Sequence, residues 1–249
     1  MKNEMYDSMF RIETRHWWFR GKRDIVLSLA EPLLSQKRRP KLIDLGCGCG
    51  AMIKALEPYG DVTGVDFSDL PLAYCRERFG GTMKKLDLSV PIETEEQFDL
   101  GVALDILEHI DRDDIAAANI YALLRDGGHC IVTVPAYQWL WSSHDENCMH
   151  KRRYCKKQLE ALLLNAGFKL AYISYYNCIL FAAAAAVRLV SRCIRADRDS
   201  SLENHFRDSL LNRILYRIFS GEKKRISKKK TFPFGLSLIA LVEKPGASA

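Results

Sequence analysis

The part of the sequence with the clearest chemical meaning is a strand-like run that ends in a glycine-rich loop, Leu42–Gly50. Glycines alternate through the loop, so its backbone can turn sharply and approach a ligand with no Cβ in the way. The spacing differs from the GxGxxG fingerprint of dinucleotide-binding proteins, and no Gly-Lys-Ser/Thr of a phosphate-binding loop follows. Asp44 at the strand end would repel a pyrophosphate but attract a cation. The loop therefore predicts a site for a cationic ligand.

A second group of reactive side chains follows the expected fifth strand, in residues 139–154. His144 is the candidate general base, with Asp145 to orient it, because an imidazole near neutral pH can accept a proton from a hydroxyl or an amine. His150 and Tyr154 are further catalytic candidates. Arg152 and Arg153 are candidates for holding an anionic group of the substrate. The alternative interpretation is a structural loop whose arginines cover the surface.

The surrounding sequence alternates short apolar runs with helical patterns from Lys41 onward. Helices are predicted over 50–58, 69–79, 113–124 and 156–166. Seven strands are predicted: Leu42–Leu45, Val62–Val65, Gly81–Lys85, Phe98–Ala103, His129–Val134, Phe168–Tyr175 and Leu236–Val242. Strands that alternate with helices indicate crossover connections, and hence an α/β protein with a mostly parallel, doubly wound sheet.

The loop resembles the first motif of the class I S-adenosylmethionine (SAM)-dependent methyltransferases, acid-x-Gly-x-Gly-x-Gly. Further motifs of that family follow in the expected order: Val65–Ser68, Leu86–Leu88, Phe98–His109, Leu123–Gly128 and Ile131–Pro135. The resemblance extends over residues 41–175 and the last strand. It implies a Rossmann-like, doubly wound sheet of seven strands, with the last strand antiparallel, and SAM as the cofactor.

The resemblance also implies which residues hold the cofactor. Asp66 would bond to both ribose hydroxyls, Asp87 would meet the adenine amino group, and Asp44 would face the sulfonium or amino group. The other cofactor-binding candidates are Gly46, Cys47, Gly48, Gly50, Phe67, Leu88, Leu104, Asp105 and His109. A solvated loop acid is the alternative for Asp66, and a helix N-cap is the alternative for Asp87.

Asp105, Glu108 and His109 lie on one side of a helical turn by their spacing. The stretch resembles that of the small-molecule O-methyltransferases of quinone biosynthesis, in which a glutamate-rich version can hold a divalent ion. The first position here is Asp rather than Glu. We therefore predict no metal, and a role for Glu108 and His109 in supporting the cofactor loop; a metal site is the alternative.

Residues 1–40 are predicted to form a helical N-terminal lid. The segment His16–Arg20 resembles the lead-in of a bacterial group of these enzymes that also carries HD-x4-HxRRY after strand five, a pattern that this chain matches over His144–Tyr154. Trp17 and Trp18 would exclude water above the cofactor and the acceptor. Ordinary aromatic core is the alternative for these two residues.

The methyltransferase domain would occupy residues 41–249, with a basic helical insertion over 176–234 between the last two strands. The insertion contains an amphipathic stretch, 204–219, and a basic run, 222–230. Residues 178–230 could recognise the acceptor or contact a membrane surface. Packing against the body or a second subunit is the alternative. Nucleic acid ranks last, because the sequence contains no recognisable binding module.

Composition excludes collagen, a long coiled coil and a largely disordered chain, with 48% hydrophobic and 27% charged residues. Eight cysteines are too few for a disulfide scaffold, and the first residues lack the apolar segment of a secretory signal. We expect a cytoplasmic protein, with peripheral contact at the inner membrane face as a further expectation.

The predicted function is methyl transfer from SAM to a small-molecule, lipid-linked or sugar-linked acceptor by direct in-line displacement. Two alternatives stay open at this point. One is an RNA or protein methyltransferase, and the other is a non-catalytic SAM-binding scaffold that acts through the basic insertion. The sequence leaves the oligomeric state open.

Overall fold

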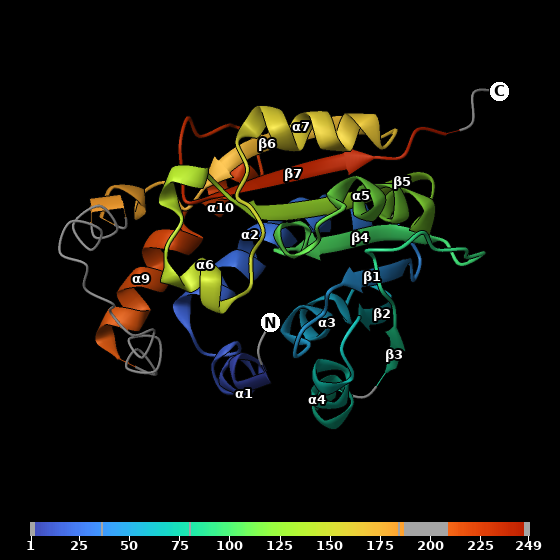
Figure 1. Ribbon diagram of the computed structural model, residues 1–249, viewed down its shortest axis with the longest axis horizontal. Coiled ribbons are helices and arrows are strands. Elements are labelled where there is room, and N and C mark those ends of the chain that lie inside the picture. The colour runs from blue at the N-terminus through green and yellow to red at the C-terminus, as the bar shows by residue number, and fades with distance from the viewer. Residues whose placement is uncertain (1–2, 36, 80, 184, 187–208, 247–249) are drawn as a thin grey trace.

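Seven strands form one sheet in the order β3-β2-β1-β4-β5-β7-β6 (Figure 1). The computed structural model describes residues 3–35, 37–79, 81–183, 185–186 and 209–246. The strands are β1 Lys41–Leu45, β2 Asp61–Asp66, β3 Thr82–Lys85, β4 Phe98–Leu104, β5 Leu124–Pro135, β6 Lys169–Tyr176 and β7 Ser237–Glu243. β1 to β5 pair in parallel, and β7 lies antiparallel between β5 and β6. The predicted α/β fold, with its antiparallel last strand, is confirmed.

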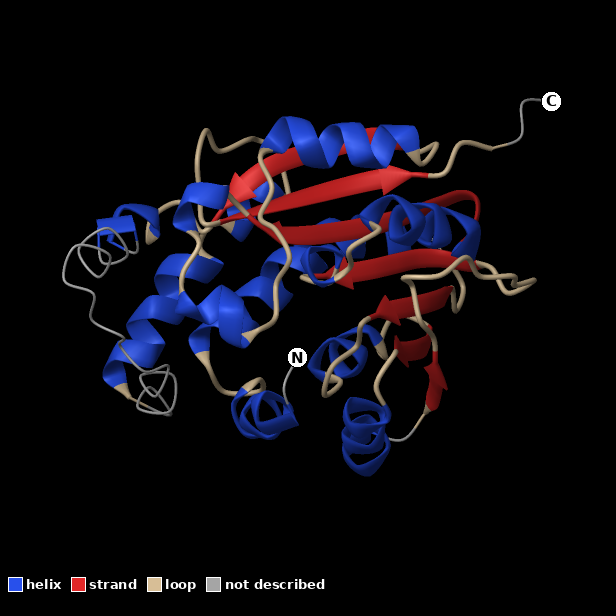
Figure 2. Ribbon diagram, in the orientation of Figure 1, coloured by secondary structure: helices blue, strands red, loops and turns tan. Residues whose placement is uncertain are grey.

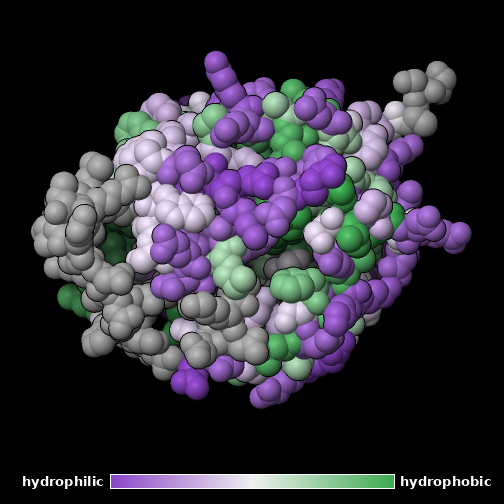
Figure 3. All heavy atoms as spheres, in the orientation of Figure 1, coloured by the Kyte–Doolittle hydropathy of each residue, from purple (hydrophilic) through white to green (hydrophobic). Residues whose placement is uncertain are grey.

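Helices cover both faces of the sheet (Figure 2). α5 (Asp113–Leu123) and α7 (Lys156–Asn165) bury their apolar residues on one face. α2 (Trp17–Leu34) and α3 (Ala51–Leu56) cover the other, with α4 (Asp69–Phe79) beside α3. A strand covered on both faces needs a nearly continuous apolar run, which is what β4 supplies. Hydrophilic side chains cover most of the face seen in Figure 3.

The strand order reverses between β1 and β4, since the chain proceeds from β1 toward β3 on one side and from β4 toward β5 on the other. β1 pairs with both β2 and β4, and Asp44 lies opposite Gly64 and Val102. The carboxyl ends of these parallel strands therefore meet at one edge, on the left in Figure 1. A crevice at such a reversal is where open α/β sheets bind ligands.

Three elements surround this edge in addition to the sheet. They are α1 (Asn3–Ile12), the 3-10 helix η1 (Leu107–His109) and α6 (Ser143–Asn147), which follows the 3-10 helix η2 (Gln138–Leu140). Of the N-terminal segment that was predicted to be helical, residues 3–12 and 17–34 form α1 and α2.

The chain between β6 and β7 contributes α9 (Leu210–Ser220) and α10 (Lys223–Ile226). α9 packs along α2: the Asn212 side chain accepts the Trp17 N–H at 2.8 Å, and the Tyr216 hydroxyl bonds to Asp24 at 2.6 Å. The predicted amphipathic stretch 204–219 is described only from residue 209 onward; 187–208 lie outside the described residues. No described helix is both long enough and apolar enough to cross a membrane.

Candidate active site

The glycine loop joins β1 to α3 in a conformation that requires glycine. Gly46, Gly48 and Gly50 have φ values of 67°, 53° and 90°, which L-residues with a side chain rarely adopt. A Cβ on Gly46 would lie 2.4 Å from Ile106 Cγ2, and one on Gly48 would lie 2.7 Å from Met9 Cε. The Cys47 N–H donates to Val65 O at 2.9 Å. The loop is therefore held close to β2 and has no room for side chains at these glycines.

Two buried carboxyls flank this loop. Asp44 is only 2% exposed, and its Oδ2 has no hydrogen-bond partner within the described part of the chain. Burial, together with the charges of Glu13 and Asp66, raises its pKa to about 8, although Lys22 acts in the opposite direction. Asp66 accepts the Gly48 N–H at 3.3 Å and the Ser68 N–H at 3.0 Å. The edge thus carries an acidic site with spare acceptor capacity.

Asp105 follows β4 in the left-handed region, with φ of 56°. It accepts hydrogen bonds from Lys22 Nζ and from Thr133 Oγ1, both at 2.8 Å. Burial opposes its ionisation, but Lys22 and Thr133 outweigh that and lower its pKa. Sequence reasoning did not identify Lys22. No local pattern connects it to Asp105, which lies 83 positions later in the sequence.

Four more of the predicted cofactor-binding residues lie at the ends of strands: Phe67 after β2, Asp87 and Leu88 after β3, and Leu104 at the end of β4. Phe67 exposes 57% of its surface, whereas Leu88 is buried and Leu104 is half-buried. Asp87 is exposed and accepts the N–H of Ser89 at 2.8 Å, so its carboxylate closes a local turn. The cofactor contacts assigned to these four residues stay predictions.

Glu108 is fully buried on η1, and neither carboxyl oxygen has a partner among the described residues. Burial and the charge of Asp105 raise its pKa well above the usual range. Its ligand atom lies within 4.8 Å of those of His109 and His150, a set of donors that could hold a metal ion. Burial and the charge of His150 lower the pKa of His109 to about 4. The expectation that no metal binds here stays a prediction.

The structure corrects the predicted partner of Asp145. Its Oδ1 lies 2.9 Å from His150 Nδ1, and Arg153 Nε donates to the same oxygen at 2.7 Å. Asp145 also accepts the Ser142 N–H as part of a capping box at the start of α6, which turns its side chain back toward the loop. It therefore orients His150, while the Nε2 of His144 lies 3.6 Å from Cys148 Sγ.

Arg152, Arg153 and Tyr154 are bonded to other residues of the chain, and their assignments to the substrate or to catalysis stay predictions. Arg153 is buried, and its guanidinium bonds to Asp145 and to Ala136 O. The Tyr154 hydroxyl donates to Asp113 at 2.8 Å, and Arg152 pairs with Asp113 at 2.9 Å. The backbone of Tyr154 forms an isolated β-bridge with Ala136 just after β5, and its hydroxyl reaches the start of α5 at Asp113. These three side chains hold the segment after β5 in place.

Trp17 and Trp18 contact the ring of Phe219 on α9. Trp18 stacks on Phe219 with ring centroids 5.2 Å apart, and Trp17 meets the same ring edge-on at 5.7 Å. Gly21 makes room for Phe219, because a Cβ there would lie 2.3 Å from Cδ1 of that ring. These contacts favour the alternative of aromatic core, and the assignment of the two tryptophans as the lid stays a prediction.

α1 is the element that covers the loop. Met9 lies against Gly48, and the thiol of Cys49 donates to the carbonyl of Tyr6 at 3.5 Å. α1 is joined to α4 by an ion pair between Glu13 and Arg78 and by stacking of Phe10 on Tyr74 at 4.5 Å. No pattern in residues 3–12 signalled this position, because the contacts are with residues some forty to seventy positions away.

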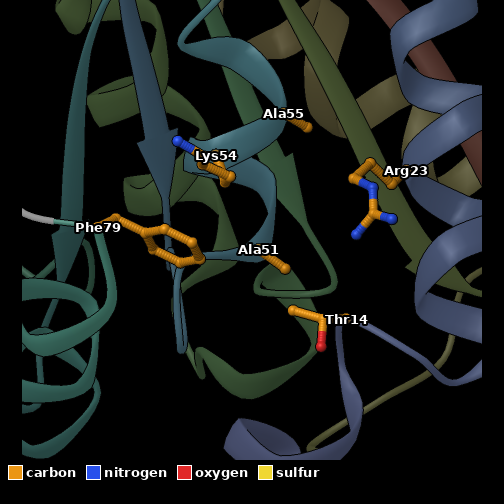
Figure 4. Close-up of a pocket in the computed structure, with 6 residues that line it drawn as sticks. All are labelled: Thr14, Arg23, Ala51, Lys54, Ala55 and Phe79. Carbon is orange, nitrogen blue, oxygen red and sulfur yellow. The ribbon is translucent and has the colours of Figure 1, made fainter.

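A cavity of 280 Å³ lies between α2 and α3, next to Ala51, the residue that follows the loop (Figure 4). It is lined by Thr14, Arg23, Ala51, Lys54, Ala55 and Phe79. None of the predicted site residues lines it, so the acidic site and this cavity are separate.

The family model described as a methyltransferase domain matches residues 43–130, which contain the glycine loop, Asp66 and the exit of β4. Over these residues the chain is similar to a methyltransferase domain, and the sheet order and the positive φ values of the glycine loop agree with that similarity. A ubiquinone biosynthesis O-methyltransferase of Stutzerimonas stutzeri (strain A1501) is 30% identical over 95 residues. That match covers 35% of this chain and 41% of the relative, so the chain spans about two fifths of the curated relatives that it matches.

Solved structures share the fold at low sequence identity. The phosphoethanolamine N-methyltransferase 2 of Haemonchus contortus, in complex with SAM, has a TM-score of 0.56 and 19% identity, covering 88% of this chain and 52% of that one. The (4+2) cyclase SpnF has a TM-score of 0.57 and 16% identity, covering 90% and 81%. A methyltransferase and a cyclase thus share this architecture, so the reaction must be argued from the site.

Proposed function

We propose that this chain transfers a methyl group from SAM to a small-molecule acceptor. The observation that carries the proposal is the acidic site at the loop: a buried Asp44 oxygen without a described partner, beside Asp66. A buried carboxyl of this kind calls for a cation or a proton. When bound, SAM supplies an electrophilic methyl group on a positively charged sulfur. The residues present fit such a group.

Three parts of the chain would hold the cofactor. Asp66 would accept from the ribose hydroxyls, Asp44 would face the positive charge, and the glycine loop would allow the close approach. We further propose that α1, rather than the tryptophans, is the lid that excludes water, because Met9 and Tyr6 contact the loop.

His150 would accept the proton of an acceptor hydroxyl or amine. Asp145 bonds to its Nδ1, which leaves Nε2 for the acceptor, and Arg153 holds Asp145 in turn. His144 stays the alternative base, since its ring centroid lies 6.2 Å from that of His150. Glu108 and His109 would supply an uncharged lining, because the pKa of Glu108 is raised and that of His109 is lowered.

SAM affinity should rise with pH below pH 8. The Asp44 pKa of about 8 means that a cation binds by displacing a proton, so the association constant increases by up to about tenfold per pH unit. Calorimetric titration of SAM and of S-adenosylhomocysteine from pH 6 to 8 measures this dependence. Asp44→Asn is the matched control. Protonation of the ligand and of Glu13 contributes to the pH dependence of both proteins, so the difference between the two slopes reports Asp44. Equal slopes in the two proteins would contradict the placement of the cation at Asp44.

We also propose that the acceptor is lipid-linked and that α9 brings the chain to the inner face of the membrane. Leu210, Leu211 and Ile214 are 72%, 46% and 44% exposed, and Arg213 and Arg217 are exposed between them. An apolar row flanked by cations suits an anionic lipid surface.

The double variant Leu210→Ser/Ile214→Ser should bind anionic vesicles at least tenfold more weakly. Each apolar side chain that leaves water stabilises binding by roughly 1.5–3 kcal/mol. Co-sedimentation with vesicles of phosphatidylglycerol and phosphatidylcholine tests this. The control is Val90→Ser/Leu164→Ser, which alters two apolar residues of similar exposure elsewhere, 53% and 47%. A wild-type chain that fails to sediment with the vesicles would end the membrane proposal.

A further inference from the structure

Two segments far apart in the sequence bring cations together at the amino ends of the strands, opposite the glycine loop. Residues 37–41 lead into β1, and Arg125 lies at the start of β5. Together they line a cavity of 510 Å³. The charged residues of the lining are five cations and one carboxylate: Lys37, Arg38, Arg39, Lys41, Arg125 and Asp99.

The single carboxylate is already fully engaged. Asp99 accepts the Lys41 N–H at 2.8 Å, Lys37 Nζ at 3.1 Å and Arg125 Nη2 at 2.5 Å, and it is 8% exposed. It can balance only one positive charge. The lining therefore keeps a large positive excess, and cations crowded in this way repel one another unless an anion binds.

Two of the cations are available to a ligand. Arg38 and Lys41 are exposed, and within the described ranges neither side chain makes an ion pair. Arg39 pairs with Asp61 at 2.7 Å, but both side chains are exposed, 79% and 61%, so water screens that pair.

We propose that this cavity binds a small anion that carries several phosphate groups. Guanidinium forks and ammonium groups on one concave surface match phosphate oxygens in geometry and charge. The cavity has the volume of a small-molecule site. The residues that line it include no aromatic ring, so a base has nothing to stack on, which argues against single-stranded RNA.

Calorimetric titration with inorganic triphosphate tests the proposal on the full chain. The wild type should bind, with an affinity that falls as salt rises, and Arg38→Gln/Lys41→Gln should bind at least about tenfold more weakly. The control Lys156→Gln/Lys157→Gln removes the same charge from α7 and should bind like the wild type. Equal losses in the two variants, or no binding by the wild type, would overturn the proposal.

Two further measurements make the result specific. SAM titration of each variant should be unchanged, because the cavity lies at the opposite end of the sheet; this separates failure here from failure of the proposed methyl transfer. Vesicles of phosphatidylglycerol and phosphatidylcholine distinguish a soluble anion from a lipid headgroup. If Arg38→Gln/Lys41→Gln lost vesicle binding while triphosphate bound to neither protein, the face would be a membrane surface and the proposal would be wrong.

Discussion

Replacing His150 with alanine is expected to lower the rate of methyl transfer about 10²–10⁴-fold while leaving SAM affinity nearly unchanged. Nδ1 of its imidazole lies 2.9 Å from Asp145 Oδ1, and its side chain is 9% exposed. The contact with Asp145 fixes the ring and thereby the direction in which Nε2 points. Without the ring, the acceptor would lose the base that Asp145 orients. Transfer of labelled methyl from SAM to lipid and sugar extracts measures the rate.

His144→Ala is the matched comparison for this result. Both histidines lie in the segment after β5, but Asp145 bonds to Nδ1 of His150, whereas Nε2 of His144 lies 3.6 Å from Cys148 Sγ. The smaller effect is therefore expected for His144→Ala. A fully active His150→Ala protein with an inactive His144→Ala protein would return the role of base to His144. Binding of SAM without transfer to any extract by the wild type would favour a non-catalytic scaffold.

Asp145→Ala should destabilise the fold by about 3–5 kcal/mol, the largest effect on stability that we expect from a single polar residue. Asp145 is fully buried, and the paired Arg153 side chain is only 4% exposed. Removing the carboxylate leaves a buried guanidinium without its counter-charge, and it also removes the cap of α6. Urea unfolding followed by circular dichroism gives the free energy of unfolding.

Two controls make the Asp145 result specific. Asp87→Ala removes an exposed carboxylate that bonds only to a neighbouring turn, and it should cost less than about 1 kcal/mol. Asp145→Leu/Arg153→Met replaces both partners with apolar groups, and it should cost less than Asp145→Ala alone. If Asp145→Ala were as stable as the wild type, the buried ion pair would not support this segment.

The contribution of Asp145 should also depend on pH in one direction. Burial opposes its ionisation, but the bonds from His150 and Arg153 outweigh that and hold its pKa well below the usual range. A carboxyl whose pKa is lowered by folding stabilises the fold fully when the pH is above its pKa in the unfolded chain, about 3.9. This stabilisation is lost as the pH falls through the pKa of the carboxyl in the folded protein. The difference in unfolding free energy between the wild type and Asp145→Asn should therefore be constant from pH 5 to 8 and shrink only in strong acid.

Much of the fold could be predicted because its signals are local. Each strand buried on both faces needs an apolar run, and each of the seven predicted runs became a strand with ends shifted by a few residues. The acids that end β1 and β2, and Asp105 after β4, were expected to share one edge, since parallel strands place their carboxyl ends together. The sharp turn of the loop was also predictable, because only glycine adopts such φ values without strain.

Partners within the site could not be predicted, because they depend on how separate elements meet. Adjacency in the sequence suggested that Asp145 orients His144, but the cap of α6 turns the carboxylate toward His150 and Arg153. Trp17 and Trp18 suggested a lid, and the sequence gave no sign of their contacts with the Phe219 ring, two hundred residues away.

The sequence by itself thus determined the sheet, the loop and the acids at its edge. Hydrophobic periodicity and backbone sterics are properties of neighbouring residues, and the carboxyl end of a strand is known once the strand is known. Only the tertiary structure decided that α1 covers the loop, that Lys22 pairs with Asp105, and that Arg125 joins the basic residues 37–41 at one cavity. Those contacts join residues that are far apart in the sequence. They depend on the charge and shape of side chains on different elements, which patterns among neighbouring residues do not specify.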